Sequence, residues 1–245
     1  MFKLALNAGH YKGTAGKRCS KSLDKNETRE WVLNDRICDK IESKLKAYDG
    51  YQLLRIDDTT GATDVSLADR VKKANTFGAD FYLSIHHNAG INGGAGGGVV
   101  AYTYTKVDDN TKAWQKELYN AIIKHTGLKG NRATPLATAN LYECRKTTMA
   151  CVLLECGFMD SKTDVPIILT DDFAEKVATA CVEVIVTRGK LTKKVVEEKP
   201  SATALSNKIY RVQVGAYSVK SNAEALQKKL KADGYDSIIV EGVKL

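Results

Sequence analysis

Short runs of apolar residues alternate along the chain with longer segments in which apolar residues recur every three or four positions. The runs are typical of buried strands, and the recurring positions are typical of helices with one buried face. The pattern predicts strands over residues 2–8, 51–56, 80–86, 99–104 and 150–155. It predicts helices over residues 30–48, 65–77, 110–125 and 173–186, the second of them capped by Asp64. This alternation indicates an α/β fold, a twisted and mostly parallel sheet covered by helices.

The last part of the chain has a different pattern. Residues 189–207 are rich in Lys, Glu, Ser, Thr and Ala around Pro200 and show little periodicity, which predicts a flexible charged linker. A strand over 209–216, a helix over 223–230 and a strand over 237–240 then form one βαβ unit, which buries little apolar surface by itself. We therefore predict a main domain over 1–188, a linker over 189–207 and a half-module over 208–245.

The positive charge is concentrated in the C-terminal part. The chain has 245 residues and a formal net charge of +8, and residues 189–245 contain 11 basic and 6 acidic residues. A basic segment favours an anionic partner such as nucleic acid, a lipid surface or a cell wall. We find no nucleic-acid-reading motif and no apolar run of the length that a membrane span needs. The N-terminal apolar run has no basic region before it and no cleavage site, so it is interpreted as a strand and not as a signal peptide.

Cysteine spacing argues against two kinds of site. There is no Cys-x-x-Cys pair, which disfavours a cysteine zinc site and a thioredoxin-type redox centre. Cys156 stands next to Glu155, but nothing nearby supplies the specific base that a nucleophile needs. We expect all six cysteines to be reduced thiols, several of them on apolar faces: Cys19, Cys38, Cys144, Cys151, Cys156 and Cys181.

Three polar side chains stand at or just past the ends of predicted strands: His10, His86 and Glu155. In parallel sheets, ligands bind beyond the carboxyl ends of the strands, so these side chains are expected at one edge. His10 follows a glycine that permits a sharp turn, and His86 ends an apolar run. Two histidines and one carboxylate, with a fourth position open to water, make a catalytic Zn²⁺ site. A single histidine is nevertheless more often structural or solvated than a ligand.

Two glutamates compete for the role of carboxylate ligand. Glu30 shares a helix face with Leu33 and Ile37 and would point at the sheet edge, whereas Glu27 would lie in the preceding loop. Both residues could instead simply favour the positive end of the helix dipole. We prefer Glu30.

Glu155 follows an apolar run, where an ionised side chain is costly to bury without a partner. Near a cation and a metal-activated water, this carboxylate could act as a general base and then as an acid. The alternative is a structural salt bridge with Arg70 or Arg145.

The other histidines and the glycine-rich loop are given ordinary roles. His87 would point away from His86, to the surface or behind the site, and His125 would end a helix. The loop from Gly90 to Gly98 lacks the Lys-Ser/Thr of a phosphate loop, so we interpret it as a mobile rim beside the site.

Taken in order, several motifs resemble a known family. They are Asn7-Ala-Gly-His10, Thr28-Arg-Glu30, Leu67…Arg70…Ala74-Asn75…Gly78-Ala-Asp80, Ser84-Ile-His86 and Leu153-Leu-Glu155-Cys-Gly-Phe158. Over nearly all of residues 1–188 the chain resembles the zinc-dependent N-acetylmuramoyl-L-alanine amidases of the amidase_3 type. The resemblance implies that Zn²⁺ is bound by His10, Glu30 and His86. It also implies that a zinc-activated water, with Glu155 as general base and acid, cleaves the amide between the N-acetylmuramic acid lactyl group and L-alanine in peptidoglycan.

The tail is similar to the first half of a SPOR domain, through Tyr210-Arg-Val-Gln-Val-Gly-Ala-Tyr217 and Asn222-Ala-Glu-Ala-Leu226. SPOR domains bind peptidoglycan glycan strands, so this resemblance implies a partial wall-binding module. Two alternatives are an inactive wall-binding protein and a zinc carboxypeptidase that acts on stem peptides. Without an export signal, we expect the protein to be made in the cytoplasm and to reach the wall after mother-cell lysis, as an autolysin, or through a holin, as a phage endolysin.

Overall fold

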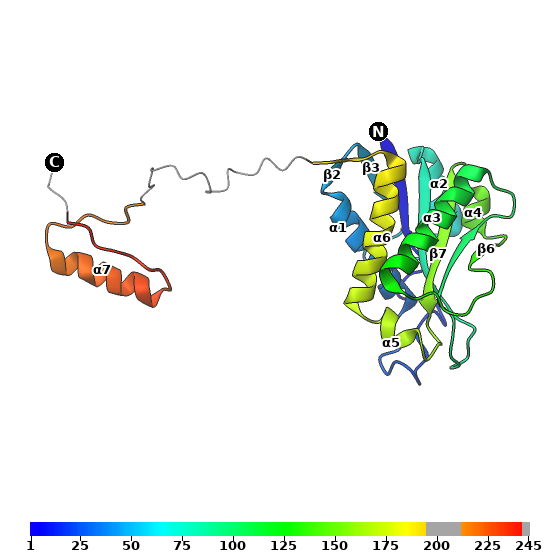
Figure 1. Cartoon of the computed structure of the whole chain (residues 1–245), viewed down its shortest axis with the longest axis horizontal. Helices are drawn as coiled ribbons and strands as arrows, with labels where there is room; N and C mark the ends of the chain where they lie inside the picture. Colours follow the sequence, from blue (N-terminus) through cyan, green and yellow to red (C-terminus); the bar gives the residue numbers. More distant parts are fainter. Residues whose placement is uncertain (195–211, 242–245) are drawn as a thin grey trace. The chain divides into compact units, whose positions relative to one another are not determined.

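A six-stranded sheet forms the centre of the first of two units (Figure 1). The structure is a computed structural model that describes residues 1–194 and 212–241. The strand order is β3-β1-β4-β7-β5-β6. The strands are β1 (Phe2–Ala8), β3 (Tyr51–Arg55), β4 (Phe81–Asn88), β5 (Val99–Thr103), β6 (Leu136–Thr138) and β7 (Ala150–Phe158). The first four strands in the order are parallel, and β5 is antiparallel to β7. The predicted mostly parallel α/β sheet is confirmed.

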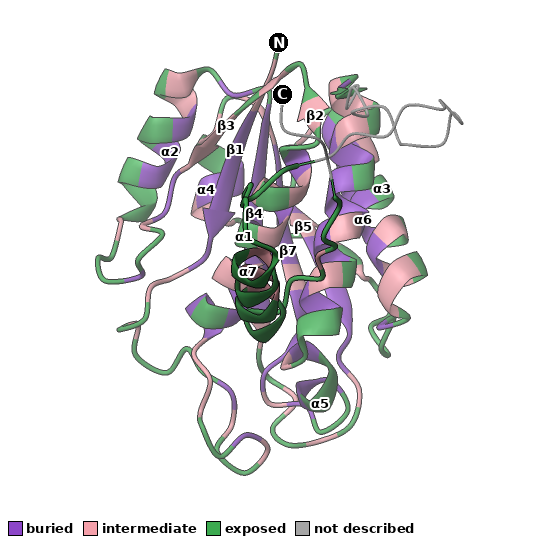
Figure 2. Ribbon diagram, turned by 90° about the vertical axis from the view of Figure 1, so that its left-hand side faces the viewer, coloured by how far each residue is buried: buried purple, intermediate pink, exposed green. Residues whose placement is uncertain are grey.

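Helices cover both faces of this sheet (Figure 2). They are α1 (Glu30–Leu45), α2 (Leu67–Phe77), α3 (Asp109–Thr126), α4 (Tyr142–Lys146), α5 (Val165–Ile168) and α6 (Asp171–Gly189). Because side chains alternate along a strand, β4 contributes to two cores. Phe81, Leu83 and Ile85 join the larger core with α1, α3 and α6, while Tyr82 joins the smaller one with α4. The edge of the sheet where β1, β4 and β7 end carries the candidate site.

Several elements differ from the predicted bounds. The helix predicted over 30–48 ends at Leu45, because Tyr48–Asp49 form strand β2 with β8 (Thr192–Lys193). Residues 189–194, predicted to begin the linker, therefore complete α6 and this two-stranded sheet. The predicted cap Asp64 is wrong. Ser66 caps α2, because its hydroxyl accepts the Asp69 N–H over 3.1 Å.

The second unit contains one helix among its described residues, α7 (Lys220–Ala232). The prediction of a strand on each side of this helix is wrong for the residues that the structure describes. Residues 212–216 and 237–240 form no strand pairing, and Val212, Val214 and Ile238 are exposed. A single parallel pair beside one helix buries too little apolar surface to hold a ladder by itself. Residues 195–207 of the predicted linker lie outside the described part, as do residues 209–211 of the first strand.

Candidate metal centre

His10 lies just past the end of β1, in a backbone conformation that side chains rarely adopt. Its φ is 66°, in the left-handed region. Arg70 of α2 holds this turn by donating hydrogen bonds to the carbonyls of Ala8, over 2.8 Å, and His10, over 2.9 Å. The preceding residue must be small, because a Cβ on Gly9 would lie 2.0 Å from Cε1 of His86. The turn therefore brings the two imidazoles together, with ring centroids 5.0 Å apart.

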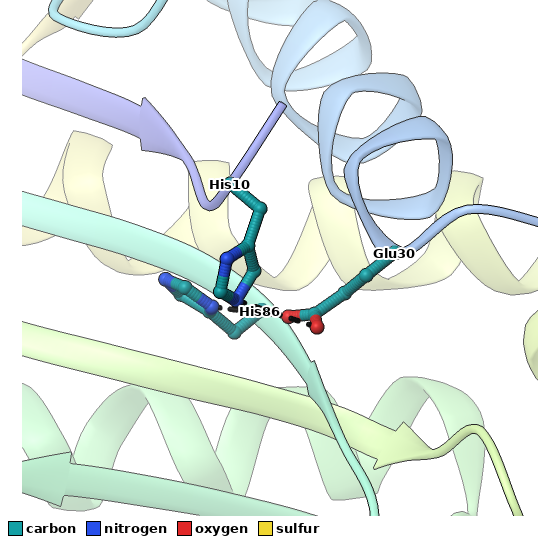
Figure 3. A group of neighbouring side chains, drawn as sticks. All are labelled: His10, Glu30 and His86. Carbon is teal, nitrogen blue, oxygen red and sulfur yellow. Dashed lines mark hydrogen bonds and ion pairs between the residues drawn. The ribbon is translucent and has the colours of Figure 1, made fainter. Parts of the chain in front are cut away.

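Glu30 is the first residue of α1, and its carboxylate points toward both histidines (Figure 3). Oε1 is 3.1 Å from Nδ1 of His86, and Oε2 is 3.4 Å from Nε2 of His10. The backbone N–H of His87 also donates to Oε1 over 3.2 Å. The carboxylate is only 1% exposed, and Lys17 approaches Oε2 to 3.6 Å. One ligand atom each from His10, Glu30 and His86 lies within 4.8 Å of the others.

These donors fit a zinc ion. Oε2 of Glu30 is a buried polar atom without a hydrogen-bond partner in the part of the chain that is described. Buried polar atoms are normally bonded, so an unpartnered carboxylate oxygen beside two imidazoles indicates a missing partner. Two imidazoles and one carboxylate also match the three protein ligands of catalytic zinc sites.

The charge states of two of the three side chains suit metal binding. Burial lowers the pKa of His10 to about 4, so this imidazole is neutral at neutral pH. Burial would raise the pKa of Glu30, but the hydrogen bond and charge of His86 and the charges of His10 and Lys17 outweigh it and lower the pKa to about 2. Burial also opposes the charged form of His86, but Glu30 outweighs it and raises the pKa of His86. A neutral imidazole and an ionised carboxylate are the forms that ligate a metal.

Glu27, the alternative ligand, lies outside this cluster. Its φ is 48°, its side chain is 30% exposed, and it pairs with Arg18 over 3.2 Å. Glu27 precedes the helix, whereas Glu30 begins it and faces the sheet edge, as the helical periodicity predicts.

Glu155 lies on β7 directly beside His86 of β4 in the parallel register. Side chains of register partners share a face of the sheet, so the carboxylate of Glu155 lies on the same face as the imidazole of His86. Its Oε2 is buried and has no hydrogen-bond partner among the described residues, and burial raises its pKa to about 7. Both strands continue past these residues, to Asn88 and Phe158, so neither side chain stands at a strand end as predicted.

The structural alternative for Glu155 is not supported. Arg70 donates to the carbonyls of Val65, Ala8 and His10 and to the side chain of Asn7. Arg145 donates to Asn140 over 2.6 Å. In the parts of the chain that the structure describes, neither arginine forms an ion pair with Glu155.

Two residues near the site were missed by sequence reasoning. The side-chain oxygen of Asn34 accepts a hydrogen bond from Nδ1 of the buried His87 over 2.8 Å, and its NH₂ group donates to the carbonyl of Gly9 over 3.1 Å. Because Asn34 follows Glu30 by four positions, helical periodicity could have placed it on the same face. Glu143 is buried beside His86, with 4.0 Å between its Oε2 and Nε2 of His86. It lies on a five-residue helix with no periodic signal.

The remaining candidate residues have contacts that are typical of structural and not catalytic roles. Cys156 is buried in the larger core, and burial raises its pKa well above the usual range, which disfavours a nucleophilic thiolate. All six cysteines are buried and free, as expected. His125 in the last turn of α3 contacts Glu183 over 3.0 Å. The glycine-rich loop is held by Asp160, whose Oδ2 accepts three consecutive backbone N–H groups.

Fold and side-chain cluster together define a candidate metal-dependent hydrolase. Residues 4–187 match the family described as N-acetylmuramoyl-L-alanine amidase, and residues 201–244 match the SPOR domain. The chain therefore belongs to the N-acetylmuramoyl-L-alanine amidase family, and it is an enzyme of that activity whose substrate is peptidoglycan. Among the described residues, no helix is long and apolar enough to cross a membrane.

Similar proteins are found among bacterial and phage enzymes. A sporulation-specific N-acetylmuramoyl-L-alanine amidase of Bacillus subtilis is 30% identical over 98% of this chain and 85% of its own length. An endolysin of Bacillus phage SPP1 is 32% identical over 80% of this chain and 72% of its own length. The catalytic domain of the amidase CwlV from Bacillus (Paenibacillus) polymyxa superposes with a TM-score of 0.68 at 24% identity, over 78% of this chain and all of that domain.

Proposed function

We propose that the protein carries out its amidase reaction at a zinc site formed by His10, Glu30 and His86, with Glu155 as general base and acid. The bond cleaved joins the lactyl group of N-acetylmuramic acid to L-alanine. The single observation that carries this proposal is the convergence of the three ligand atoms within 4.8 Å, next to the Glu155 carboxylate on the neighbouring strand. Members of this family are generally zinc-dependent.

Zinc at this site would supply Lewis acidity, polarising the amide carbonyl and lowering the pKa of water. The chain's own residues do the rest. Glu30 and His10 are held in their ligating forms, the first by neighbouring charges and the second by burial. Glu155 accepts the proton of the attacking water and donates it to the leaving amine of L-alanine. A carboxyl whose pKa lies close to the working pH suits both transfers.

The test separates metal binding from proton transfer. Full-length wild type, Glu155→Gln and His86→Ala are assayed for bound zinc and for digestion of purified peptidoglycan, with new chain ends identified by mass spectrometry. We expect Glu155→Gln to keep its zinc and lose activity, and His86→Ala to lose both. Walls digested by Glu155→Gln at the wild-type rate would overturn the role of Glu155. Release of D-alanine, without new L-alanine amino groups, would indicate a carboxypeptidase instead.

We also propose that the C-terminal unit strengthens attachment to the wall by binding glycan strands. Its match to the SPOR domain supports this, as does the basic helix α7 with Lys228, Lys229 and Lys231. The full chain carrying Glu155→Gln is sedimented with intact walls and with glycan strands stripped of stem peptides. We expect stronger binding to the stripped strands, and equal binding to both would contradict the proposal.

For the biological setting, we propose that the enzyme reaches the wall when its host cell lyses. The support is that similar proteins are named a sporulation-specific amidase and a phage endolysin. In a sporulating or infected culture, fractionation should find the enzyme in the cytosol before lysis and on the wall afterwards. Wall-bound enzyme in intact growing cells would contradict this setting.

A further inference from the structure

Glu143 is a buried carboxylate that the proposed mechanism does not use. It lies on α4 and is 4% exposed. Its Oε1 accepts hydrogen bonds from the hydroxyl of Tyr82 and, over 3.0 Å, from the side-chain amide of Asn7. Its Oε2 lies 4.0 Å from Nε2 of His86. Because two donors fix Oε1, the carboxylate is held with its second oxygen toward the imidazole.

A buried carboxylate requires a partner that offsets its charge. Within the part of the chain that the structure describes, His86 is the one basic side chain at ion-pair distance from Glu143. Arg70 does not offset the charge of Glu143, because its N–H groups donate to Asn7 and to backbone carbonyls. The location of Glu143 is therefore explained by the imidazole.

The two nitrogens of His86 face different groups. Nδ1 lies 3.1 Å from Oε1 of Glu30, on the side of the candidate zinc site. Nε2 is buried and, within the described residues, finds no hydrogen-bond partner, so the carboxylate of Glu143 is its polar neighbour. A ligating imidazole binds metal through one nitrogen and carries a proton on the other. In metal sites that N–H is usually directed at a carboxylate, carbonyl or water, which fixes the tautomer and the orientation of the ring.

We propose that Glu143 is a positioning residue for the metal centre: it keeps the proton of His86 on Nε2 and so leaves Nδ1 free to bind zinc. The inference rests on the proposed function, since it requires zinc at His10, Glu30 and His86. Glu143 and Glu155 then have separate tasks beside the same imidazole. Glu155 exchanges protons with the substrate, whereas Glu143 governs how tightly zinc is held.

Glu143→Gln tests this with almost no change in side-chain size. The amide oxygen can still accept from Tyr82 and Asn7, which turns the NH₂ group toward Nε2 of His86. The NH₂ group would then face the N–H of His86, so that neither can accept a hydrogen bond from the other. We expect zinc affinity to fall about 10- to 100-fold, as it does when other metal-ligating histidines lose their hydrogen-bond partner. Affinity is measured on the full chain by competition with a chromophoric chelator. Tyr82→Phe is the matched control, because it loosens the same buried cluster but keeps the carboxylate facing His86.

A second measurement requires no substitution. In the zinc-loaded wild type, ¹⁵N NMR should show zinc on Nδ1 of His86 and an exchange-protected proton on Nε2. Zinc on Nε2, or a zinc affinity of Glu143→Gln equal to that of wild type, would overturn the inference and leave the proposed function intact. A wild-type protein that binds no zinc, or that binds it equally after His86→Ala, would overturn both.

Discussion

The guanidinium of Arg70 donates a hydrogen bond over 2.9 Å to the backbone carbonyl of His10. A second one reaches the carbonyl of Ala8 over 2.8 Å. Through these bonds, a buried side chain of α2 holds the end of β1 and the left-handed turn at His10, which directs this imidazole toward Glu30. The geometry of the candidate metal centre thus depends on an arginine that contributes no ligand.

We therefore expect Arg70→Ala to weaken both the fold and the site. The substitution removes the donor to the carbonyls of Ala8, His10 and Val65 and to the side-chain oxygen of Asn7. The free energy of unfolding should therefore fall by about 3 kcal/mol. Arg70→Lys keeps the charge but has a single nitrogen in place of the two that reach the carbonyls of Ala8 and His10, so its zinc affinity should lie between those of wild type and Arg70→Ala. Urea unfolding and chelator competition measure the two quantities. Arg145→Ala is the control, and wild-type zinc affinity in Arg70→Lys would contradict the argument.

Gly9→Ala should damage the centre by sterics alone. A Cβ there would stand 2.0 Å from Cε1 of His86, and Gly9 is not among the residues with positive φ, so backbone strain adds nothing. The imidazole must leave its place, and we expect zinc affinity and amidase activity to be lost together.

Gly127→Ala is the matched control for this steric effect. Its added Cβ meets no atom within 4 Å, but its φ is 71°. It should therefore lower stability by about 1 kcal/mol and leave zinc affinity unchanged. Equal zinc affinities for the two alanine variants would contradict the close approach of Gly9 and His86.

Glu30→Gln and Glu27→Gln form a pair that tests the choice of carboxylate ligand. Both remove one negative charge near the start of α1, so the effect of charge on the helix dipole is similar. Of the two, only Glu30 contacts both His10 and His86. We expect zinc to be lost from Glu30→Gln and retained by Glu27→Gln, as measured by metal analysis after gel filtration. Loss of zinc from both variants would mean that charge, and not ligation, is what matters.

Much of this architecture could be predicted from the sequence. Strands β1, β4 and β7 have strong apolar runs, and the helical stripe that begins at Glu30 distinguished this glutamate from Glu27. Local periodicity is sufficient for such features, because each depends on which face of one element is buried.

Other features depend on how distant segments meet. The register that sets His86 beside Glu155 is a property of the β4–β7 pair and not of either strand. The carboxylate of Glu143 reaches the site from a short helix without periodicity. The C-terminal strands were predicted from alternation alone, but a ladder needs a partner and a buried face as well.

Asp160 gives a pH-dependent prediction that does not involve the metal ligands. Its Oδ2 accepts N–H groups of Gly90, Ile91 and Asn92 over 2.8, 2.9 and 2.8 Å. Burial would raise its pKa, but these three hydrogen bonds outweigh it and hold the pKa below the usual 3.8. Because the folded pKa is the lower one, the carboxylate stabilises the loop above the unfolded pKa and loses that effect as the pH falls through the folded pKa.

Hydrogen exchange of these three amides, corrected for intrinsic rates, should therefore show protection that is constant near neutral pH and decreases below about pH 4. Asp160→Asn keeps an oxygen acceptor but removes the charge, which makes the bonds weaker at every pH. Its amides should exchange faster than wild type at neutral pH, and they should lose the acid-dependent change. Amides in the interior of β1, between Lys3 and Ala8, lie in the strand pairing with β3 and β4 and are the internal reference; those of Lys3 and Ala8 are left out because they donate to Asp80 and Asp57. If the wild-type and Asp160→Asn loops showed the same protection at neutral pH, the carboxylate would not be what orders this rim of the site.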